Sequence, residues 1–238
     1  MIVALQIGKG KSQGVPGKNK KIILGRPLME YPLIAASKCK KIDKIFISTD
    51  SDELEKIASP YNVERIYRPS NLSKSETLTE DVLIHAIECM RNDYNINPEI
   101  IVLLFCNVAT TTTDNLISAI DIIEKDTSID SVFSVTEFNM FSPMRAKKLN
   151  KDNFIQSYID LDQFKSLSSI RDEQETCYYA DLSIQILRPR CIDNISNGMP
   201  PIKWMGTKSY GLVTDGFFDI DAEWQFSVVE NWLKQKGV

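Results

Sequence analysis

The sequence predicts an α/β fold in which a mostly parallel sheet is covered by helices on both faces and carries an inserted β-rich arm. Strand and helix patterns alternate from Ile2 to Val135, and several strands are continuous apolar runs typical of strands buried on both faces. The alternation stops after about Glu137. With 238 residues, the chain fits a single domain with an arm at about 138–170.

The predicted elements follow one another with short connections. Runs of β-branched and apolar residues indicate strands at 2–7, 44–49, 63–67, 100–105, 131–135, 180–187 and 217–220. Apolar residues at helical spacing indicate helices at about 27–41, 52–58, 77–90, 116–123 and 224–234. Thr77-x-x-Glu80 has the pattern of a capping box, which would begin the third of these helices.

Composition excludes several classes of protein. Hydrophobic residues make up 43% and charged residues 25%, and no apolar run reaches membrane-spanning length. Residues 1–7 lack the basic region and cleavage site of a leader peptide, so we expect a cytoplasmic location and no membrane partner. The five cysteines are scattered without Cys-x-x-Cys spacing, which argues against a zinc knuckle or a redox pair. The net charge of −4 argues against a nucleic-acid partner.

One segment reverses this acidic balance. Residues 9–21 carry five lysines and no acidic residue, and they follow directly after the first strand, where a doubly wound sheet binds its ligands. Gly8 and Gly10 let backbone N–H groups approach phosphate oxygens, and the lysines supply positive charge. The spacing fits neither a Walker A loop nor a dinucleotide fingerprint. A solvated basic loop is the alternative interpretation.

Asp219-Ile220-Asp221 is a candidate metal site. In an extended segment alternate side chains share a face, so both carboxylates can point into one cleft. Mg²⁺ prefers hard oxygen ligands and often uses one or two carboxylates together with substrate phosphates. The alternative is that Asp221 caps the final helix. His85, the only histidine, is interpreted as a structural residue of its helix.

Together these segments resemble the sugar-acid cytidylyltransferases, which include the CMP-N-acylneuraminate, CMP-nonulosonate and CMP-Kdo synthetases. The segments that carry the resemblance keep the family's order: 8–19, 47–51, Arg68-Pro69, the strand to Phe105, 131–136 and 218–221. The resemblance implies a Rossmann-like fold, a homodimer built through the arm, and CTP with Mg²⁺ as co-reactants. The anomeric hydroxyl of an acidic sugar would attack the α-phosphorus of CTP and release pyrophosphate.

The resemblance also implies roles for single residues. A nucleotide would contact Gly8, Lys9, Gly10, Lys11, Ser12, Lys18, Asn19, Arg68 and Thr79, with Lys9 and Lys18 also catalytic beside Asp219 and Asp221. Arg171 and Asp181 would contact the sugar acid, because the family carries a basic residue about ten positions before the matching strand. A guanidinium can bind a carboxylate through two hydrogen bonds. A surface arginine is the alternative.

The chain departs from the family at several positions. Lys9 stands where the family has Arg, Lys11 where it has Gly, and Asp181 where it has Asn. Phe105 and Thr111 begin and end the segment that replaces the family's Gln-Pro-Thr-Ser-Pro-Leu-Arg. These departures leave the base and the sugar acid open. They also motivate one alternative, a catalytically inactive binding or scaffold relative. A second alternative is a GT-A-type glycosyltransferase of similar topology, whose Asp-x-Asp would hold a metal.

Overall fold

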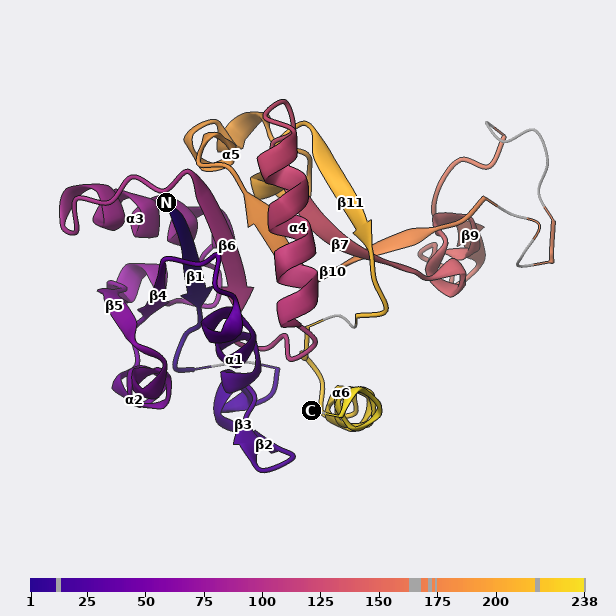
Figure 1. Ribbon diagram of the computed structural model, residues 1–238. Helices are drawn as coiled ribbons and strands as arrows, with labels where there is room; N and C mark the ends of the chain where they lie inside the picture. The colour runs from indigo at the N-terminus through magenta and orange to yellow at the C-terminus, as the bar shows by residue number, and fades with distance from the viewer. Residues whose placement is uncertain (12–13, 163–167, 171–172, 174, 217–218, 238) are drawn as a thin grey trace.

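A seven-stranded sheet in the order β11-β7-β10-β6-β1-β4-β5 forms the centre of the computed structural model (Figure 1). The structure describes residues 1–11, 14–162, 168–170, 173, 175–216 and 219–237. The strands of the sheet are β1 (Ile2–Ile7), β4 (Lys44–Thr49), β5 (Val63–Tyr67), β6 (Ile100–Phe105), β7 (Ser131–Glu137), β10 (Tyr178–Leu187) and β11 (Ser209–Val213). All pairings are parallel except those of β10, which is antiparallel to β6 and β7. The predicted α/β fold with a mostly parallel sheet is confirmed.

Helices cover both faces of the sheet because neighbouring residues of each buried strand point to opposite sides. The helices are α1 (Glu30–Lys38), α2 (Asp52–Ala58), α3 (Thr79–Asn92), α4 (Thr113–Lys125), α5 (Arg190–Asp193) and α6 (Gln225–Lys236). Ala4 and Val102 belong to the core beneath α1, α2 and α4. Val3 and Leu103 belong to the opposite core, beneath α3 and α5. No helix of the described residues is long and apolar enough to cross a membrane.

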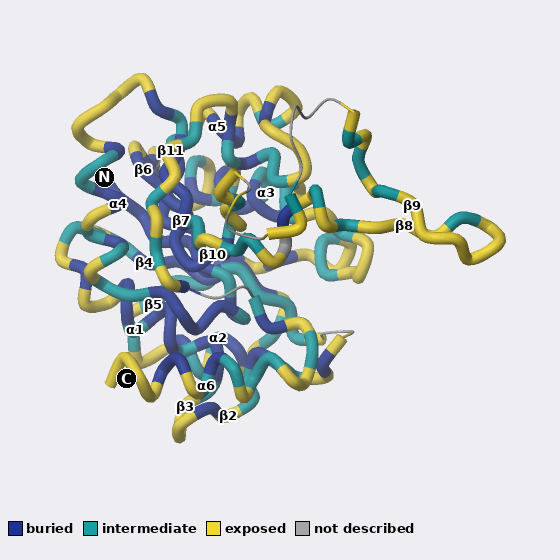
Figure 2. The backbone as a smooth tube through the Cα atoms, turned by 90° about the vertical axis from the view of Figure 1, so that its right-hand side faces the viewer, coloured by how far each residue is buried: buried dark blue, intermediate teal, exposed yellow. Residues whose placement is uncertain are grey.

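Between β7 and β10 the chain leaves the sheet as an arm. It includes the antiparallel strands β8 (Lys147–Leu149) and β9 (Ile155–Ser157), which project from the body of the molecule (Figure 2). Leu149, Phe154 and Ile155 are exposed on this hairpin. The described part of the segment 138–170 thus contains one short β-hairpin.

The last helix brings the C-terminal segment to the N-terminal half of the chain. Val229, Trp232 and Leu233 of α6 pack against Ile23 and Leu28, which lie in and after the small β2–β3 hairpin (Ile22–Ile23 and Arg26–Pro27). Ile220, just before α6, is buried in the same cluster. This packing places the residues around Ile220 beside the loop that follows β1.

One local prediction was wrong, and another lies partly outside the described residues. Helix α3 begins at Thr79 with the extended residue Leu78 at its N-cap position and no side-chain cap, so Thr77 forms no capping box. The Thr77 hydroxyl instead donates to the carbonyl of Asn71 at 3.2 Å. In the predicted strand at 217–220, the first two residues lie outside the described part of the chain, and Asp219 belongs to no strand. The strand that follows the arm and β10 is β11, which the sequence pattern did not indicate.

Candidate functional site

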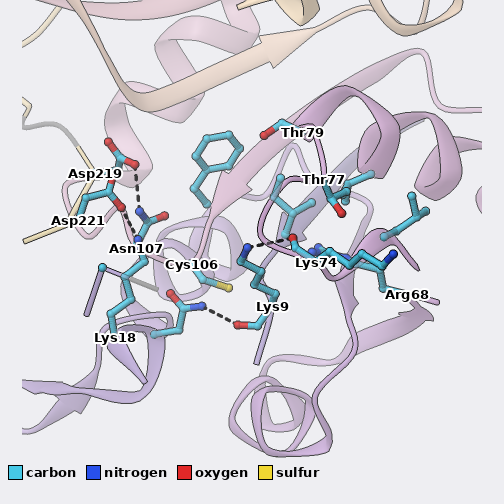
Figure 3. A pocket seen from close by; sticks show the side chains of 17 residues that line it. Lys9, Lys18, Arg68, Lys74, Thr77, Thr79, Cys106, Asn107, Asp219 and Asp221 are labelled. Carbon is cyan, nitrogen blue, oxygen red and sulfur yellow. Dashed lines mark hydrogen bonds and ion pairs between the residues drawn. The ribbon is translucent and has the colours of Figure 1, made fainter. Parts of the chain in front are cut away.

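A cavity of about 340 Å³ opens at the carboxyl ends of β1, β5 and β6 (Figure 3). Strand β1 lies between β4 and β6, so the chain leaves β1 toward one side of the sheet and reaches β6 on the other. Ligands of open α/β sheets bind beside such a change of direction. The lining residues come from distant parts of the sequence: Ile7, Gly8, Lys9, Gly14, Lys18, Asn19, Arg68, Leu72, Lys74, Thr77, Thr79, Val82, Phe105, Cys106, Asn107, Asp219 and Asp221.

The loop after β1 forms one wall of the cavity. It passes so close to Cys106 that a Cβ on Gly8 would lie 2.3 Å from the Cys106 sulfur, so any larger residue at position 8 would force Cys106 or the loop to move. Asn19 Nδ2 donates to the Lys9 carbonyl at 3.2 Å, and Lys9 Nζ donates to the Lys74 carbonyl at 3.1 Å. Asn19 is only 6% exposed, and no described residue donates to its Oδ1. A buried acceptor without a donor favours a ligand that supplies one.

Two carboxylates and a lysine meet at the other end of the cavity (Figure 3). Asp219 Oδ2 accepts from Asn107 Nδ2 at 3.0 Å. Lys18 Nζ donates to the Ile220 carbonyl at 2.8 Å and forms an ion pair with the Asp221 carboxylate. Burial and the neighbouring charge of Asp221 raise the pKa of Asp219, while the Asn107 hydrogen bond and the charge of Lys18 oppose this rise. These groups form a compact acidic site with one cation beside it.

The acidic pair fits Mg²⁺ better than a metal that needs a full set of protein ligands. No group of three or more His, Cys, Asp and Glu side chains that could hold a metal ion occurs within the described part of the chain. Mg²⁺ requires less, since it keeps several waters and binds through one or two carboxylates and substrate phosphates. Burial, and after it the charge of Asp221, raises the pKa of Asp219, and a cation bound between the two carboxylates would oppose both effects.

Arg68 lines the cavity after the end of β5. It is 7% exposed, with Nε donating to Ser48 Oγ at 3.2 Å and Nη2 to the Ser48 carbonyl at 2.6 Å. Burial lowers the pKa of Arg68, an effect that Cys106 and Asp50 only partly oppose. Arg68 has no ion-pair partner among the described residues, so burying its guanidinium costs desolvation free energy that no opposite charge offsets. A hydrogen-bond acceptor on a ligand would stabilise the buried charge.

Most of the predicted site residues line this one cavity, namely Gly8, Lys9, Lys18, Asn19, Arg68, Thr79, Asp219 and Asp221. Gly10 and Lys11 do not line it: the Gly10 amide donates to Asp50 Oδ1 at 2.9 Å, and Lys11 is exposed. Ser12 and Arg171 lie outside the described residues. The structure thus places residues predicted to bind the nucleotide and residues predicted to bind the metal in the wall of one cavity, although they are far apart in the sequence.

Asp181, the other predicted contact of the sugar acid, does not line the cavity. It is 1% exposed and accepts four hydrogen bonds. The donors are Ser134 Oγ at 2.5 Å, Thr136 Oγ1 at 2.7 Å, the Ser183 amide at 2.8 Å and Thr214 Oγ1 at 3.1 Å. These bonds tie β7, β10 and the residue after β11 together, so the structure places Asp181 inside the sheet.

Several cavity residues were not predicted as site residues. Asn107 and Cys106 directly follow β6 and so carry the same signal that marks Gly8, a position just after a buried parallel strand. Burial raises the pKa of the Cys106 thiol to about 12, which leaves it protonated and a poor nucleophile. Lys74 and Thr77 belong to an irregular segment whose sequence gives no comparable signal.

Three further residues singled out in the sequence occupy different places. Phe105 lines the cavity, and its ring centre lies 6.2 Å from that of Trp204. Thr111 is buried and donates to the Ser183 carbonyl at 2.8 Å, so it stabilises β10. His85 lies in α3 with Nε2 3.6 Å from Cys89 Sγ and is absent from the cavity wall, in agreement with its structural interpretation.

A model of the cytidylyltransferase family matches residues 9–190. The chain belongs to this family. The match includes Lys9, Lys18 and Arg68 and ends before Asp219, so the cavity extends beyond the matched segment.

The names of the relatives of this chain specify different sugar acids. The chain is 31% identical over 151 residues to the N-acylneuraminate cytidylyltransferase of Oncorhynchus mykiss, and this alignment covers 62% of this chain and 33% of that protein. It is 26% identical over 164 residues to the N-acylneuraminate cytidylyltransferase of Escherichia coli, covering 69% and 38%. It is 27% identical over 161 residues to the pseudaminic acid cytidylyltransferase of Campylobacter jejuni, covering 67% and 68%. The matched part of the chain thus corresponds to little more than a third of the first two relatives.

Solved structures share the fold of the whole chain. The structure of CMP:2-keto-3-deoxy-manno-octonic acid synthetase complexed with CTP superposes with a TM-score of 0.68 at 12% identity and covers 99% of both chains. The 4-diphosphocytidyl-2C-methyl-D-erythritol synthase of Anaerococcus prevotii gives a TM-score of 0.65 at 14% identity, covering 98% of this chain and 96% of that one. At these identities the comparison establishes the fold alone, an α/β fold with a mostly parallel sheet, as expected from the sequence.

Proposed function

We propose that this chain is a cytidylyltransferase that couples CTP to an acidic sugar, a nonulosonic or related ulosonic acid, and releases pyrophosphate. The observation that carries this proposal is the cavity, where Lys9 and Lys18 from the first loop, the buried Arg68 and the carboxylates of Asp219 and Asp221 line one space. Cations suit a triphosphate, and a carboxylate pair suits the Mg²⁺ that accompanies it.

The proposed reaction is a nucleotidyl transfer. The anomeric hydroxyl oxygen of the sugar forms a bond to the α-phosphorus of CTP, the bond between that phosphorus and the bridging oxygen breaks, and pyrophosphate leaves. The hydroxyl proton passes to solvent. Lys9 and Lys18 would bind phosphate oxygens, and because they already face the cavity, they would stabilise developing negative charge with little rearrangement.

The nucleoside is proposed to lie toward Asn19, Arg68 and Thr79. The unpartnered Asn19 Oδ1 supports this placement, because a ribose hydroxyl or the amino group of cytosine would supply its missing donor. The buried guanidinium of Arg68 would in turn donate to an oxygen of the nucleotide.

Mg²⁺ is part of this proposal, with Asp219 and Asp221 as the residues that would hold it. When bound, the ion would neutralise phosphate charge and favour the departure of pyrophosphate. Lys18 forms an ion pair with Asp221 and would remain close to the phosphates that accompany the metal.

The acidic sugar is proposed from the relatives, whose names specify N-acylneuraminate and pseudaminic acid. Arg171 remains a predicted partner for the sugar's carboxylate. We further propose a homodimer formed through the arm, supported by exposed apolar side chains there: Leu149 at 63%, Phe154 at 69% and Ile155 at 72%. A cytoplasmic location is supported by the cysteines, all of which are free thiols.

Pyrophosphate release tests the proposal directly. The purified chain would be incubated with Mg²⁺ and each of CTP, UTP, GTP and ATP, against a panel containing N-acetylneuraminic, pseudaminic, legionaminic and 2-keto-3-deoxyoctonic acids. We expect release with CTP and one of these acids. Binding of Mg²⁺ and CTP with no release from any pairing would favour the inactive relative. Transfer of sugar from a nucleotide sugar would favour the glycosyltransferase.

A further inference from the structure

Asn107 joins the end of the central strand to the acidic segment. It is the second residue after β6, in a turn closed by a hydrogen bond from the Val108 amide to the Phe105 carbonyl at 3.2 Å. Its side chain lines the cavity between β6 and the C-terminal segment (Figure 3). It is therefore fixed to the most buried part of the sheet while facing the proposed metal site.

Three hydrogen bonds connect Asn107 to residues 219 and 220. The Ile220 amide donates to the Asn107 carbonyl at 2.9 Å, and Asn107 Nδ2 donates to the Ile220 carbonyl at 3.3 Å. The same Nδ2 donates to Asp219 Oδ2 at 3.0 Å. Ile220 is fully buried beneath α6, so the backbone between the two acids is held by packing as well as by hydrogen bonds.

The two carboxylates are held by different partners. Lys18 binds Asp221 through an ion pair, whereas Asn107 donates to Asp219. An amide keeps its hydrogen-bond donor at every accessible pH and carries no charge that would repel a cation. A carboxamide at position 107 can therefore orient Asp219 without competing for the metal that Asp219 is proposed to bind.

We propose that Asn107 is a positioning residue, which holds the Asp219 carboxylate in the orientation that binds the divalent cation. This inference rests on the proposed function, because it concerns the same site. Groups that orient a metal-binding carboxylate commonly change metal affinity or activity about 10- to 100-fold when removed.

Asn107→Ala is a suitable test because it removes the two side-chain hydrogen bonds and keeps the backbone bond from Ile220. Binding of Mn²⁺ to the full chain with saturating CTP would be followed by electron paramagnetic resonance. Binding of CTP alone would be measured by calorimetry in EDTA. We expect the Kd for Mn²⁺ to rise at least about tenfold, while the Kd for CTP alone stays within about twofold because no phosphate contact is removed.

Two further variants sharpen the test. Asn107→Leu keeps roughly the size of the side chain and removes the donor without adding a charge or a metal ligand, so it should weaken Mn²⁺ binding as well. Mn²⁺ binding as tight as in the wild type would therefore contradict the need for a donor. Asn194→Ala removes a comparable bond, from Asn194 Nδ2 to the Arg190 carbonyl at 3.2 Å, at a place that does not line the cavity, and should leave both constants unchanged.

The outcomes separate this inference from the proposed function. Equal Mn²⁺ affinity in the wild type and in Asn107→Ala would overturn the inference alone. A parallel loss of CTP and Mn²⁺ affinity in Asn107→Ala would also overturn it, since it would show general disruption of the cavity. A wild-type protein that binds CTP but no Mn²⁺ would overturn both the inference and the proposed metal site.

Discussion

Replacing Lys18 by methionine separates the two contributions that we assign to this lysine. One is structural, because Lys18 Nζ donates to the Ile220 carbonyl at 2.8 Å and pairs with Asp221. The other is the proposed contact with the triphosphate. Methionine keeps the apolar stem of a side chain that is 15% exposed and removes only the ammonium group.

The structural contribution is small. The Asp221 side chain is 66% exposed, and an ion pair with an exposed carboxylate contributes at most about 1 kcal/mol. The Ile220 carbonyl would keep Asn107 as a donor at 3.3 Å. For a domain of this size, 1 kcal/mol lowers Tm by about 2–4 °C. Removing one donor from a site of developing charge, by contrast, lowers kcat about 10²- to 10³-fold, or about 2.7–4 kcal/mol.

Differential scanning fluorimetry without ligand and pyrophosphate release under saturating CTP and Mg²⁺ measure the two effects separately. Lys20→Met is a matched control, because Lys20 lies in the same loop, pairs with Glu53 and does not line the cavity. We expect normal turnover in the control. A Lys18→Met protein with wild-type kcat would refute the phosphate contact, and a fall in Tm much beyond about 4 °C would refute the small structural contribution.

Three other predictions concern Asp219, Asn19 and Asp130. Asp219→Asn should lower the rate of Mg²⁺-dependent pyrophosphate release at least about 100-fold with an unchanged Tm. Asp215 is exposed, and the control variant Asp215→Asn should retain activity. An active Asp219→Asn protein would exclude Asp219 as a metal ligand. Asn19→Ala should weaken CTP binding about fivefold in calorimetry, since one hydrogen bond contributes about 1 kcal/mol, and unchanged affinity would place the nucleoside elsewhere. Burial raises the pKa of Asp130, but hydrogen bonds from Arg190 and two backbone amides outweigh it and lower the pKa to about 2. At pH values above the pKa of the unfolded state, the ionised Asp130 therefore adds about 1–2 kcal/mol to the free energy of unfolding. This contribution is lost as the pH falls toward 2. Urea unfolding at a series of pH values should show the loss in the wild type and not in Asp130→Asn.

The buried strands were predictable because each is a run of apolar residues that can be recognised without knowledge of the rest of the fold. Residues 100–105 form an unbroken apolar run, and β6 occupies that same range. The direction of a strand is not encoded in this way. β10 is also apolar, but its antiparallel course depends on how the arm returns the chain to the sheet. Strand β11 was missed because it lies at the sheet edge, contains Gly211 and is mostly exposed, so its apolar pattern is weak.

The site was predictable where spacing alone was informative. Asp219 and Asp221 line one cavity, as their separation of two residues predicts, although neither belongs to a strand. The contribution of Asn107 depends on a contact across 112 residues, which no local pattern could indicate. Asp181 carries a charge in a strand, a pattern typical of a functional residue, yet its carboxylate is satisfied by hydroxyl and amide donors inside the sheet.

The ion pair between Lys18 and Asp221 joins two residues 203 positions apart, and α6 secures that junction. During synthesis the N-terminal loop leaves the ribosome long before its acidic partners exist, so the sheet can form while the cavity still lacks one wall. Contacts of such long sequence separation form late, because the loop-closure entropy must be overcome first. Nascent chains that end before Asp219 should consequently adopt the sheet without acquiring the complete cavity, and removal of α6 should disable the site in a molecule whose central strands remain paired.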